Sequence, residues 1–327
     1  MTLNELGDLI LNKDNFIITA HEAPDGDAIG SEIVLQSILQ YLHKNAIIIN
    51  SDPTDHKYGF MDPKGIINHI RKDDPLPIKP EDYTLFVVDT EPGNIGHLGS
   101  RLNKDTVRDL LVIDHHDYKN GTPFQGIFIS EASSTCEILY KLLKHFAIPF
   151  FNPLTEAMFA GIVYDTGSFI YPKTSAETFE IAHQLVLNGA RPNFVYSELY
   201  ESKSTESLKL RTLVGATMEL HYSDHLAYQY MSKKMLVESG ARYEESQEIV
   251  NIPLQCNAVR ISVFVKENNE GVTRCSIRTK NEIDCLTLAS RFGGGGHPTA
   301  AGFKITQAID EVKKEILDFF APYFNKK

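Results

Sequence analysis

Four short apolar segments of this chain each lead into an aspartate or a histidine. The segments cover residues 16–20, 84–88, 110–113 and 157–163, and the polar residues that end them are His21, Asp89, Asp114 and Asp165. One aspartate after a strand is more often a turn or capping residue, but four such junctions in one domain favour a shared site. The first three segments read as buried strands and the fourth as the end of a helix. Strands that alternate with helices predict a parallel α/β sheet, whose strand ends form ligand sites.

The first junction is the richest in polar side chains. Between the strand at 16–20 and a helical pattern at 29–41, the loop carries His21, Asp25 and Asp27, with Pro24 and Gly26 to bend the chain. One imidazole and two carboxylates within seven positions are a metal-ligand set, and the other three junctions supply the partners. Imidazole and carboxylate ligands suit hard octahedral cations such as Mn²⁺ or Mg²⁺.

Composition limits the class of protein and of partner. A chain of 327 residues predicts two domains, and 42% hydrophobic and 23% charged residues are typical of a soluble protein. No apolar window is long enough for a membrane span and the start lacks a signal-peptide pattern, so we expect a cytoplasmic protein without a membrane partner. The net charge of −11 argues against long duplex nucleic acid as a partner, because such binding needs many cations. A small phosphorylated partner is expected instead.

The cysteines do not suggest a metal or disulfide framework. They show no C-x-x-C spacing, and we expect packed, reduced thiols at Cys136, Cys256, Cys275 and Cys285.

The order of predicted elements divides the chain into three parts. We expect an N-terminal parallel-sheet domain at 1–190, with a further strand at 45–50 and a short helix at 65–70. A linker helix is expected at 191–218. A smaller α/β domain is expected at 219–327, with its strands and helices at 226–231, 258–265, 272–279, 285–291 and 309–319.

The second domain carries its own candidate site. Four consecutive glycines, residues 293–296, lead to His297. Such a run packs poorly but allows close backbone approach to an anion. Strand periodicity at 272–279 places Arg274, Ser276 and Arg278 on one face, where an arginine can bind phosphate. In the first domain, Ser134 stands before a helical pattern, so it either caps that helix or faces substrate phosphate.

These motifs resemble those of the DHH phosphoesterase superfamily, whose name spells Asp114-His115-His116. The stretch from His21 to Ser31, Asp89 and Asp165 match further motifs of the superfamily in order. The run from Phe292 to Phe303 is similar to the glycine-rich signature of the associated DHHA1 domain. The length of the chain and the residues of its motifs most resemble those of the NrnA group. Members of that group hydrolyse very short oligonucleotides and, in many cases, 3′-phosphoadenosine 5′-phosphate (pAp).

The resemblance implies a role for each residue of the first domain's site. Two divalent cations, Mn²⁺ in preference to Mg²⁺, are expected, with Asp89 bridging them. The implied metal ligands are His21, Asp25, Asp27, Asp89, His115 and Asp165. His116 is implied as a catalytic residue that contacts the attacked phosphate or the leaving oxygen, with Asp114 orienting an imidazole.

The resemblance also favours Arg278 in the second domain, where Thr279 replaces the commoner serine. The full set of expected substrate-binding residues is Ser134, Arg278, Thr279, Gly294, Gly295, Gly296 and His297. If the second domain holds one end of the substrate across a cleft, only short chains fit. The expected partners are therefore short 5′-phosphorylated oligoribonucleotides or pAp.

The sequence leaves several functions open. The first is hydrolysis of short oligoribonucleotides to mononucleotides, together with conversion of pAp to AMP. Alternatives are an exopolyphosphatase or pyrophosphatase, a phosphodiesterase for cyclic dinucleotides or linear pApA, and a silent nucleotide-binding regulator. The polarity of degradation, the metal used and the oligomeric state are also open, with a homodimer among the options.

Overall fold

The computed structural model describes residues 1–118, 124–268, 272–280 and 283–324. Contacts divide the chain into two compact units, Met1–Ser202 and Lys203–Lys327. The linker helix predicted at 191–218 brackets this division, but it is not one helix, because residues 202–204 leave the helical conformation. Among the described residues, no helix is long and apolar enough to span a bilayer.

The first unit is built on a six-stranded sheet in which every pairing is parallel. The strand order is β3-β2-β1-β4-β5-β6, so the predicted parallel α/β class is confirmed. Its strands are β1 Asn15–Thr19, β2 Asn45–Asn50, β3 Ile67–His69, β4 Thr84–Val88, β5 Asp109–Asp114 and β6 Gly126–Phe128. Strands β1, β4 and β5 are continuous apolar runs, as expected of strands that are covered on both faces.

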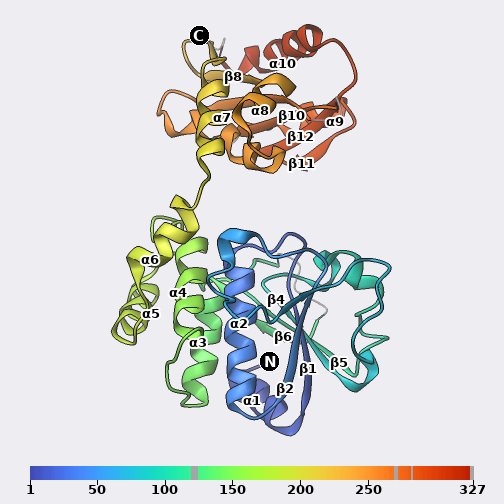
Figure 1. Ribbon diagram of the computed structural model, residues 1–327, viewed down its shortest axis with the longest axis vertical. Coiled ribbons are helices and arrows are strands. Elements are labelled where there is room, and N and C mark those ends of the chain that lie inside the picture. Colours follow the sequence, from blue (N-terminus) through green and yellow to red (C-terminus); the bar gives the residue numbers. More distant parts are fainter. Residues whose placement is uncertain (119–123, 269–271, 281–282, 325–327) are drawn as a thin grey trace. The chain divides into compact units, whose positions relative to one another are not determined.

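Helices cover one face of this sheet (Figure 1). The helices next to the strands are α1 Leu3–Asn12, α2 Gly26–Tyr41 and α3 Thr135–His145. Helix α4 Leu154–Asp165 packs on α2 and α3, and α5 Ala176–Leu187 and α6 Pro192–Tyr196 pack on α4. Helix α2 is buried from Gly26 to Leu39 because α3 and α4 pack on it. The other face is covered by the segment after β4, which includes the 3₁₀ helices η3 Pro92–Asn94 and η4 Gly96–Ser100 and buries Ile95, Leu98 and Leu102.

The second unit contains a mixed sheet of order β11-β12-β10-β9-β8-β7, in which only β8 and β9 pair in parallel among the described strands. The strands are β7 Glu219–His221, β8 Leu226–Met231, β9 Ile261–Glu267, β10 Thr273–Thr279, β11 Gly295–His297 and β12 Ala300–Ile305. The smaller C-terminal α/β domain is thus confirmed.

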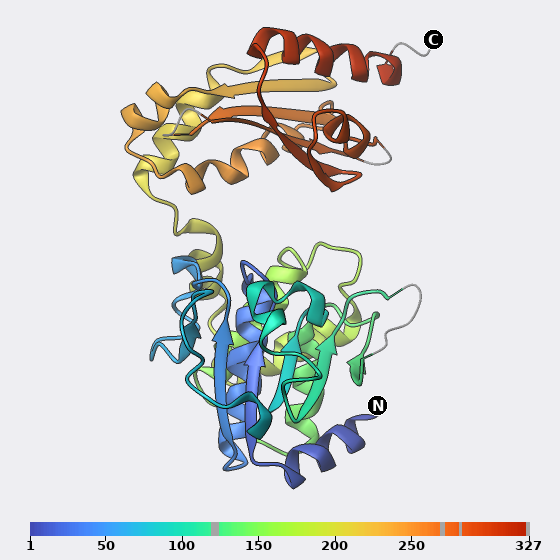
Figure 2. The same ribbon diagram turned by 90° about the vertical axis from the view of Figure 1, so that its right-hand side faces the viewer.

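Each face of the second sheet has its own helical cover (Figure 2). Helices α9 Leu286–Arg291 and α10 Ile309–Phe324 pack on the face that carries Cys275 and Ile277. Helices α7 Thr205–Gly215, α8 Lys233–Ser239 and the 3₁₀ helix η6 Tyr243–Asn251 cover part of the opposite face, around Phe264.

The structure corrects two local predictions. Residues 65–70 do not form a helix, because Ile67–His69 pairs with β2 as an edge strand. The glycine run is not simply a loop, since Gly295–His297 forms a hairpin with β12. A Cβ atom at Gly294 would lie 2.2 Å from the Gly302 carbonyl oxygen, so close packing of this hairpin itself requires glycine.

Candidate metal centre

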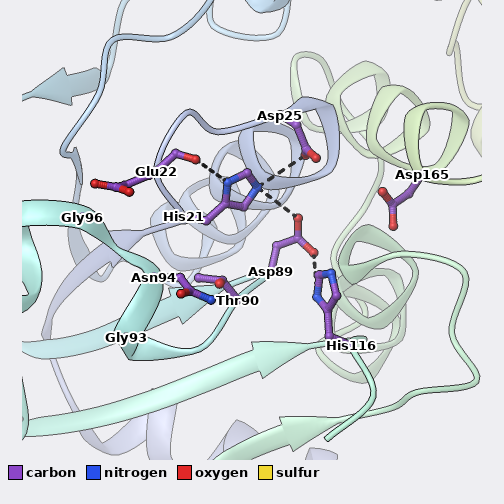
Figure 3. A pocket seen from close by; sticks show the side chains of 10 residues that line it. All are labelled: His21, Glu22, Asp25, Asp89, Thr90, Gly93, Asn94, Gly96, His116 and Asp165. Carbon is purple, nitrogen blue, oxygen red and sulfur yellow. Dashed lines mark hydrogen bonds and ion pairs between the residues drawn. The ribbon is translucent and has the colours of Figure 1, made fainter. Parts of the chain in front are cut away.

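A cavity of about 550 Å³ opens at the carboxyl ends of β1, β4 and β5, where parallel sheets bind ligands. Figure 3 shows that His21, Asp25, Asp89 and His116 point into it. The complete lining is His21, Glu22, Asp25, Asp89, Thr90, Gly93, Asn94, Gly96, His116 and Asp165. The polar residues that end separate strands in the sequence therefore converge on one pocket.

Asp89 lies at the centre of the polar cluster. Its buried carboxylate lies 3.9 Å from His21 Nε2 and 3.5 Å from His115 Nε2. The residue follows β4 directly and has a φ of +60°, a conformation that is costly for a residue other than glycine. Strained backbone conformations of this kind cluster at functional sites, where the surrounding structure enforces them.

Asp27 is held by the amino end of a neighbouring helix. It lies in the first turn of α2, where Asp25 is the N-cap residue. Its Oδ2 accepts a hydrogen bond from the Thr135 amide at 2.6 Å, and its Oδ1 accepts one from the Cys136 amide at 3.1 Å. Amides at the start of a helix stabilise an anion. The first amides of α3 therefore bind this carboxylate.

The structure brings all six predicted metal ligands together. In each of two groups, three ligand atoms lie within 4.8 Å of one another. The groups are His21, Asp25 and Asp89, and Asp27, His115 and Asp165. A further group, which includes the two residues not predicted as ligands, is Asp89, Asp114, His115 and His116. Asp89 also lies beside His115, so its carboxylate is within reach of both three-residue groups.

The chemistry of these groups fits divalent cations. His115 Nε2 is buried and makes no hydrogen bond to any described residue, although Asp165 Oδ2 lies 2.9 Å away. The opposite nitrogen, Nδ1, lies 3.3 Å from the Ala132 carbonyl oxygen, which leaves Nε2 as the ligand atom. Oxygen and imidazole donors without a thiol in either group suit Mn²⁺ or Mg²⁺.

Without metal ions, the buried carboxylates of this cluster repel one another, which raises the pKa of two of them. Burial and the charge of Asp27 raise the pKa of Asp89 well above its usual value. Burial and the charge of Asp165 raise the pKa of Asp27 to about 6. Burial lowers the pKa of His21, but the Asp25 carboxylate and the Glu22 carbonyl outweigh burial and raise it to about 8. Either protons or cations must offset this charge.

We predict that the metal-free protein loses stability as the pH rises from 5.5 to 8. A folded-state pKa above the ordinary value stabilises the protein at low pH, and that contribution disappears as the pH rises through the folded value. Asp27 shifts from 3.8 to about 6, His21 from 6.5 to about 8, and burial shifts Glu32 from 4.5 to about 8. We expect melting in EDTA about 5 °C lower at pH 8 than at pH 5.5.

Added Mn²⁺ should reverse this dependence, because it binds the deprotonated carboxylates and stabilises the folded state more at pH 8. The pKa values of Asp25 and Asp114 are lowered, so these groups cost stability only below about pH 4, outside the window. Thermal unfolding across this pH range with EDTA or Mn²⁺ provides the measurement. A metal-free melting temperature that rises toward pH 8 would contradict the charge distribution described.

Asp114 binds an imidazole, as expected, and also a tyrosine. Its Oδ1 accepts a hydrogen bond from His116 Nδ1 at 2.7 Å, and its Oδ2 accepts one from the Tyr118 hydroxyl. Burial raises the pKa of Asp114, but the hydrogen bonds from His116 and Tyr118 outweigh burial and lower it. Asp114 thus stays ionised and fixes the His116 ring, which is more than half exposed to the pocket.

The expected substrate-binding residues lie in different surroundings. Ser134 is buried and accepts the Glu137 amide hydrogen bond as the N-cap of α3, so its contact with substrate stays a prediction. In the second unit, Arg278 is half-buried, and the Thr279 hydroxyl donates to the Ile283 carbonyl at 2.6 Å. Gly294 is half-buried, whereas Gly295, Gly296 and His297 are exposed along β11.

Several residues of the site were not predicted from the sequence. The Thr135 hydroxyl donates to Asp89 Oδ1 at 3.0 Å, and Lys173 Nζ donates to the His115 carbonyl at 3.0 Å. Glu22, Thr90 and Asn94 line the cavity. Glu22 and Thr90 each follow a predicted ligand, which is a usable signal, but nothing near Lys173 in the sequence points to His115.

Comparison with known proteins agrees with these observations. The model of the DHH family N-terminal domain matches residues 15–162, and that of the DHHA1 domain matches residues 224–326. The chain is 27% identical to the bifunctional oligoribonuclease and PAP phosphatase NrnA of Bacillus subtilis, over 93% of both chains. It is 26% identical to the cyclic-di-AMP phosphodiesterase GdpP of B. subtilis, over 96% of this chain and 49% of that protein.

A solved structure shares the fold. The exopolyphosphatase-related protein of Bacteroides fragilis superimposes with a TM-score of 0.85 at 24% identity, over 99% of this chain and 97% of that one. With the two domain matches, the order of motifs and the Asp and His cluster, the resemblance seen in the sequence is confirmed. The chain belongs to the DHH/DHHA1 family of phosphoesterases, which are hydrolases.

Proposed function

We propose that this protein is a metal-dependent phosphodiesterase that hydrolyses short 5′-phosphorylated oligoribonucleotides to mononucleotides and also converts pAp to AMP. The observation that carries the proposal is the convergence of six carboxylate and imidazole side chains, Asp89 among them, in two adjacent groups, four of which line one cavity. The similarity to an oligoribonuclease and PAP phosphatase along almost the whole of both chains supports this substrate class.

In this proposal, the two groups of ligands each hold one divalent cation, Mn²⁺ in preference to Mg²⁺. His21 and Asp25 hold the first, Asp27, His115 and Asp165 hold the second, and Asp89 contributes to both. Bound cations supply Lewis acidity, which acidifies water and neutralises negative charge on a phosphate ester. The α3 amides keep the Asp27 carboxylate oriented when no substrate is present.

His116 is the proposed catalytic residue, and Asp114 its positioning residue. Because Asp114 accepts a hydrogen bond from His116 Nδ1, the ring is held with Nε2 available to the substrate. The Asp114 carboxylate also stabilises an imidazolium, which can donate from Nε2 to a phosphate oxygen or to the leaving oxygen. This interaction strengthens as negative charge develops, so it acts on the rate of the chemical step.

Two other functions fit the same metal centre. Hydrolysis of polyphosphate or pyrophosphate is an alternative because a cation pair in a polar cavity acts on any phosphate ester or anhydride. Hydrolysis of a cyclic dinucleotide or of linear pApA is another, and the partial match to a cyclic-di-AMP phosphodiesterase favours testing it. Arginines on one face of β10 favour a substrate with several phosphates over a single nucleotide.

The test compares several substrates in parallel with Mn²⁺ present: a 5′-phosphorylated diribonucleotide, a ten-residue RNA, pAp, polyphosphate and a cyclic dinucleotide. We expect rapid hydrolysis of the dinucleotide, slower hydrolysis of the ten-residue RNA and turnover of pAp. Turnover of polyphosphate alone, or of the cyclic dinucleotide alone, would overturn the proposed substrate class and leave the metal centre intact.

We also propose that Arg278, Thr279, Gly294, Gly295, Gly296 and His297 contact the substrate away from the scissile phosphate. Arg278→Ala should raise KM for the dinucleotide about tenfold or more, because one charge-assisted phosphate contact is lost. Mn²⁺ binding, measured by titration calorimetry, should stay unchanged. Equal loss of metal binding and substrate binding would contradict this assignment, and Lys314→Gln on α10 provides a control for loss of charge.

A further inference from the structure

One face of the second unit's sheet carries a row of three cations at the same level of neighbouring strands. Arg274 on β10 pairs directly with Lys266 on β9 and with Lys304 on β12. Directly opposed residues have Cβ atoms only about 5 Å apart, and like charges in such pairs destabilise a sheet. The row therefore costs the free protein stability.

The described part of the chain offers these cations no ionic partner. Lys266, Arg274 and Lys304 make no ion pair with any described residue, in a chain whose net charge is −11. The next residue on β9, Glu267, points to the opposite face of the sheet by strand alternation. Among the described residues, the Glu244 carboxylate lies close enough to raise the pKa of Lys266, but it forms no ion pair with the row, and no acidic residue is part of the row itself.

The Lys266 side chain is held by residues of η6. It is 6% exposed, its Nζ donates to Ser246 Oγ at 3.3 Å, and its Nζ lies 4.7 Å from the centre of the Tyr243 ring. Burial and the charges of Arg274 and Arg278 lower its pKa to about 8. Arg274 and Lys304 are exposed, so they present the row to solvent.

The row is separate from the predicted contact at Arg278. Four residues along β10 correspond to about 13 Å between the Cα atoms of Arg274 and Arg278. Between them lies Ser276, and the residue opposite it on β12 is Gly302. A phosphate chain can therefore run along this strip without meeting a large side chain from β12.

We propose that Lys266, Arg274 and Lys304 bind a third phosphate group of an oligonucleotide. This inference rests on the proposed function: one phosphate reacts at the metal centre and Arg278 contacts a second. Both pAp and a 5′-phosphorylated dinucleotide carry two phosphates, whereas a 5′-phosphorylated trinucleotide carries three. The row thus adds affinity only from the trinucleotide upward. Arg274 binds the phosphate in bidentate fashion, and the two lysines act as point charges.

The test measures the KM of the full chain for 5′-phosphorylated di- and triadenylate, from initial rates of hydrolysis with Mn²⁺ present, at several salt concentrations. Arg274→Gln and Lys304→Gln are compared with Lys314→Gln, an exposed lysine on α10 across the sheet. We expect Arg274→Gln to raise KM for the trinucleotide about tenfold and KM for the dinucleotide less than twofold. The slope of log(1/KM) against log salt for the trinucleotide should fall by about 0.7 for each cation removed.

Folding is controlled within the same experiment. Because each substitution relieves repulsion, Arg274→Gln and Lys304→Gln should melt at or above the wild-type temperature. An unchanged KM for the trinucleotide in both variants, or equal increases in KM for the two substrates, would overturn the row as a third-phosphate site. If Mn²⁺-dependent dinucleotide hydrolysis persists in that case, the proposed function stands and only this inference fails. Absence of dinucleotide hydrolysis in the wild type would instead overturn the proposed function.

Discussion

Replacement of Asp89 by alanine should lower the catalytic rate by at least about 10³-fold, more than the loss of one transition-state hydrogen-bond donor costs. The Asp89 carboxylate lies near both ligand groups, 3.9 Å from His21 Nε2 and 3.5 Å from His115 Nε2. Its removal thus weakens both proposed cation sites at once. Mn²⁺-dependent hydrolysis of a 5′-phosphorylated dinucleotide is the measurement.

The same substitution should leave the metal-free fold intact. Asp89 lies in a cluster of carboxylates that raise its pKa, so its loss relieves repulsion, which offsets the lost hydrogen bond from Thr135 and the cost of alanine at positive φ. We expect Asp89→Ala in EDTA to melt no lower than the wild type at pH 8, and Mn²⁺ to give it little further stability. Asp73→Asn, at an exposed position of the same unit, controls for the loss of charge. Full activity in Asp89→Ala would refute the shared-ligand role.

His116→Ala should lower kcat about 10²–10³-fold, which is typical of removing one donor that stabilises developing charge. His116 lies outside the groups around Asp25 and Asp165 and forms a further cluster with Asp89, Asp114 and His115, but its Nδ1 is engaged by Asp114. KM and the Mn²⁺ titration should therefore change little. Steady-state kinetics and calorimetry on one protein sample separate these effects.

Asp114→Asn should lower kcat through its effect on His116. An asparagine keeps the shape of the side chain but cannot stabilise the imidazolium as a carboxylate does, so we expect a smaller fall in kcat than in His116→Ala. If His116→Ala lost Mn²⁺ in proportion to its activity, His116 would be a ligand and the proposed catalytic role would be wrong.

Much of the first unit could be predicted from the sequence because its strands are continuous apolar runs. Residues 84–88 were expected as a strand, and β4 has those bounds. Parallel strands end at one edge of a sheet, so the side chains after them had to converge there. His21, after β1, and Asp89, after β4, accordingly lie in one cavity although they are 68 positions apart in the sequence.

The missed features depend on contacts between distant segments. The edge strand at 67–69 forms because it pairs with β2, and this pairing cannot be predicted from the local sequence. The amides that hold Asp27 come from residues more than 100 positions away. From the sequence, the glycine run is interpreted as an anion-binding loop. The structure shows that close packing against Gly302 is enough to require glycine at position 294.

The number of cations bound per chain tests the central claim most directly. Mn²⁺ is titrated into EDTA-stripped wild type, His21→Ala and Asp165→Ala, and bound metal is counted after removal of the free ion. We predict two Mn²⁺ per wild-type chain and one in each variant, because the variants remove ligands from different groups. A single Mn²⁺ in the wild type, or two in both variants, would contradict a two-cation centre built from these six side chains.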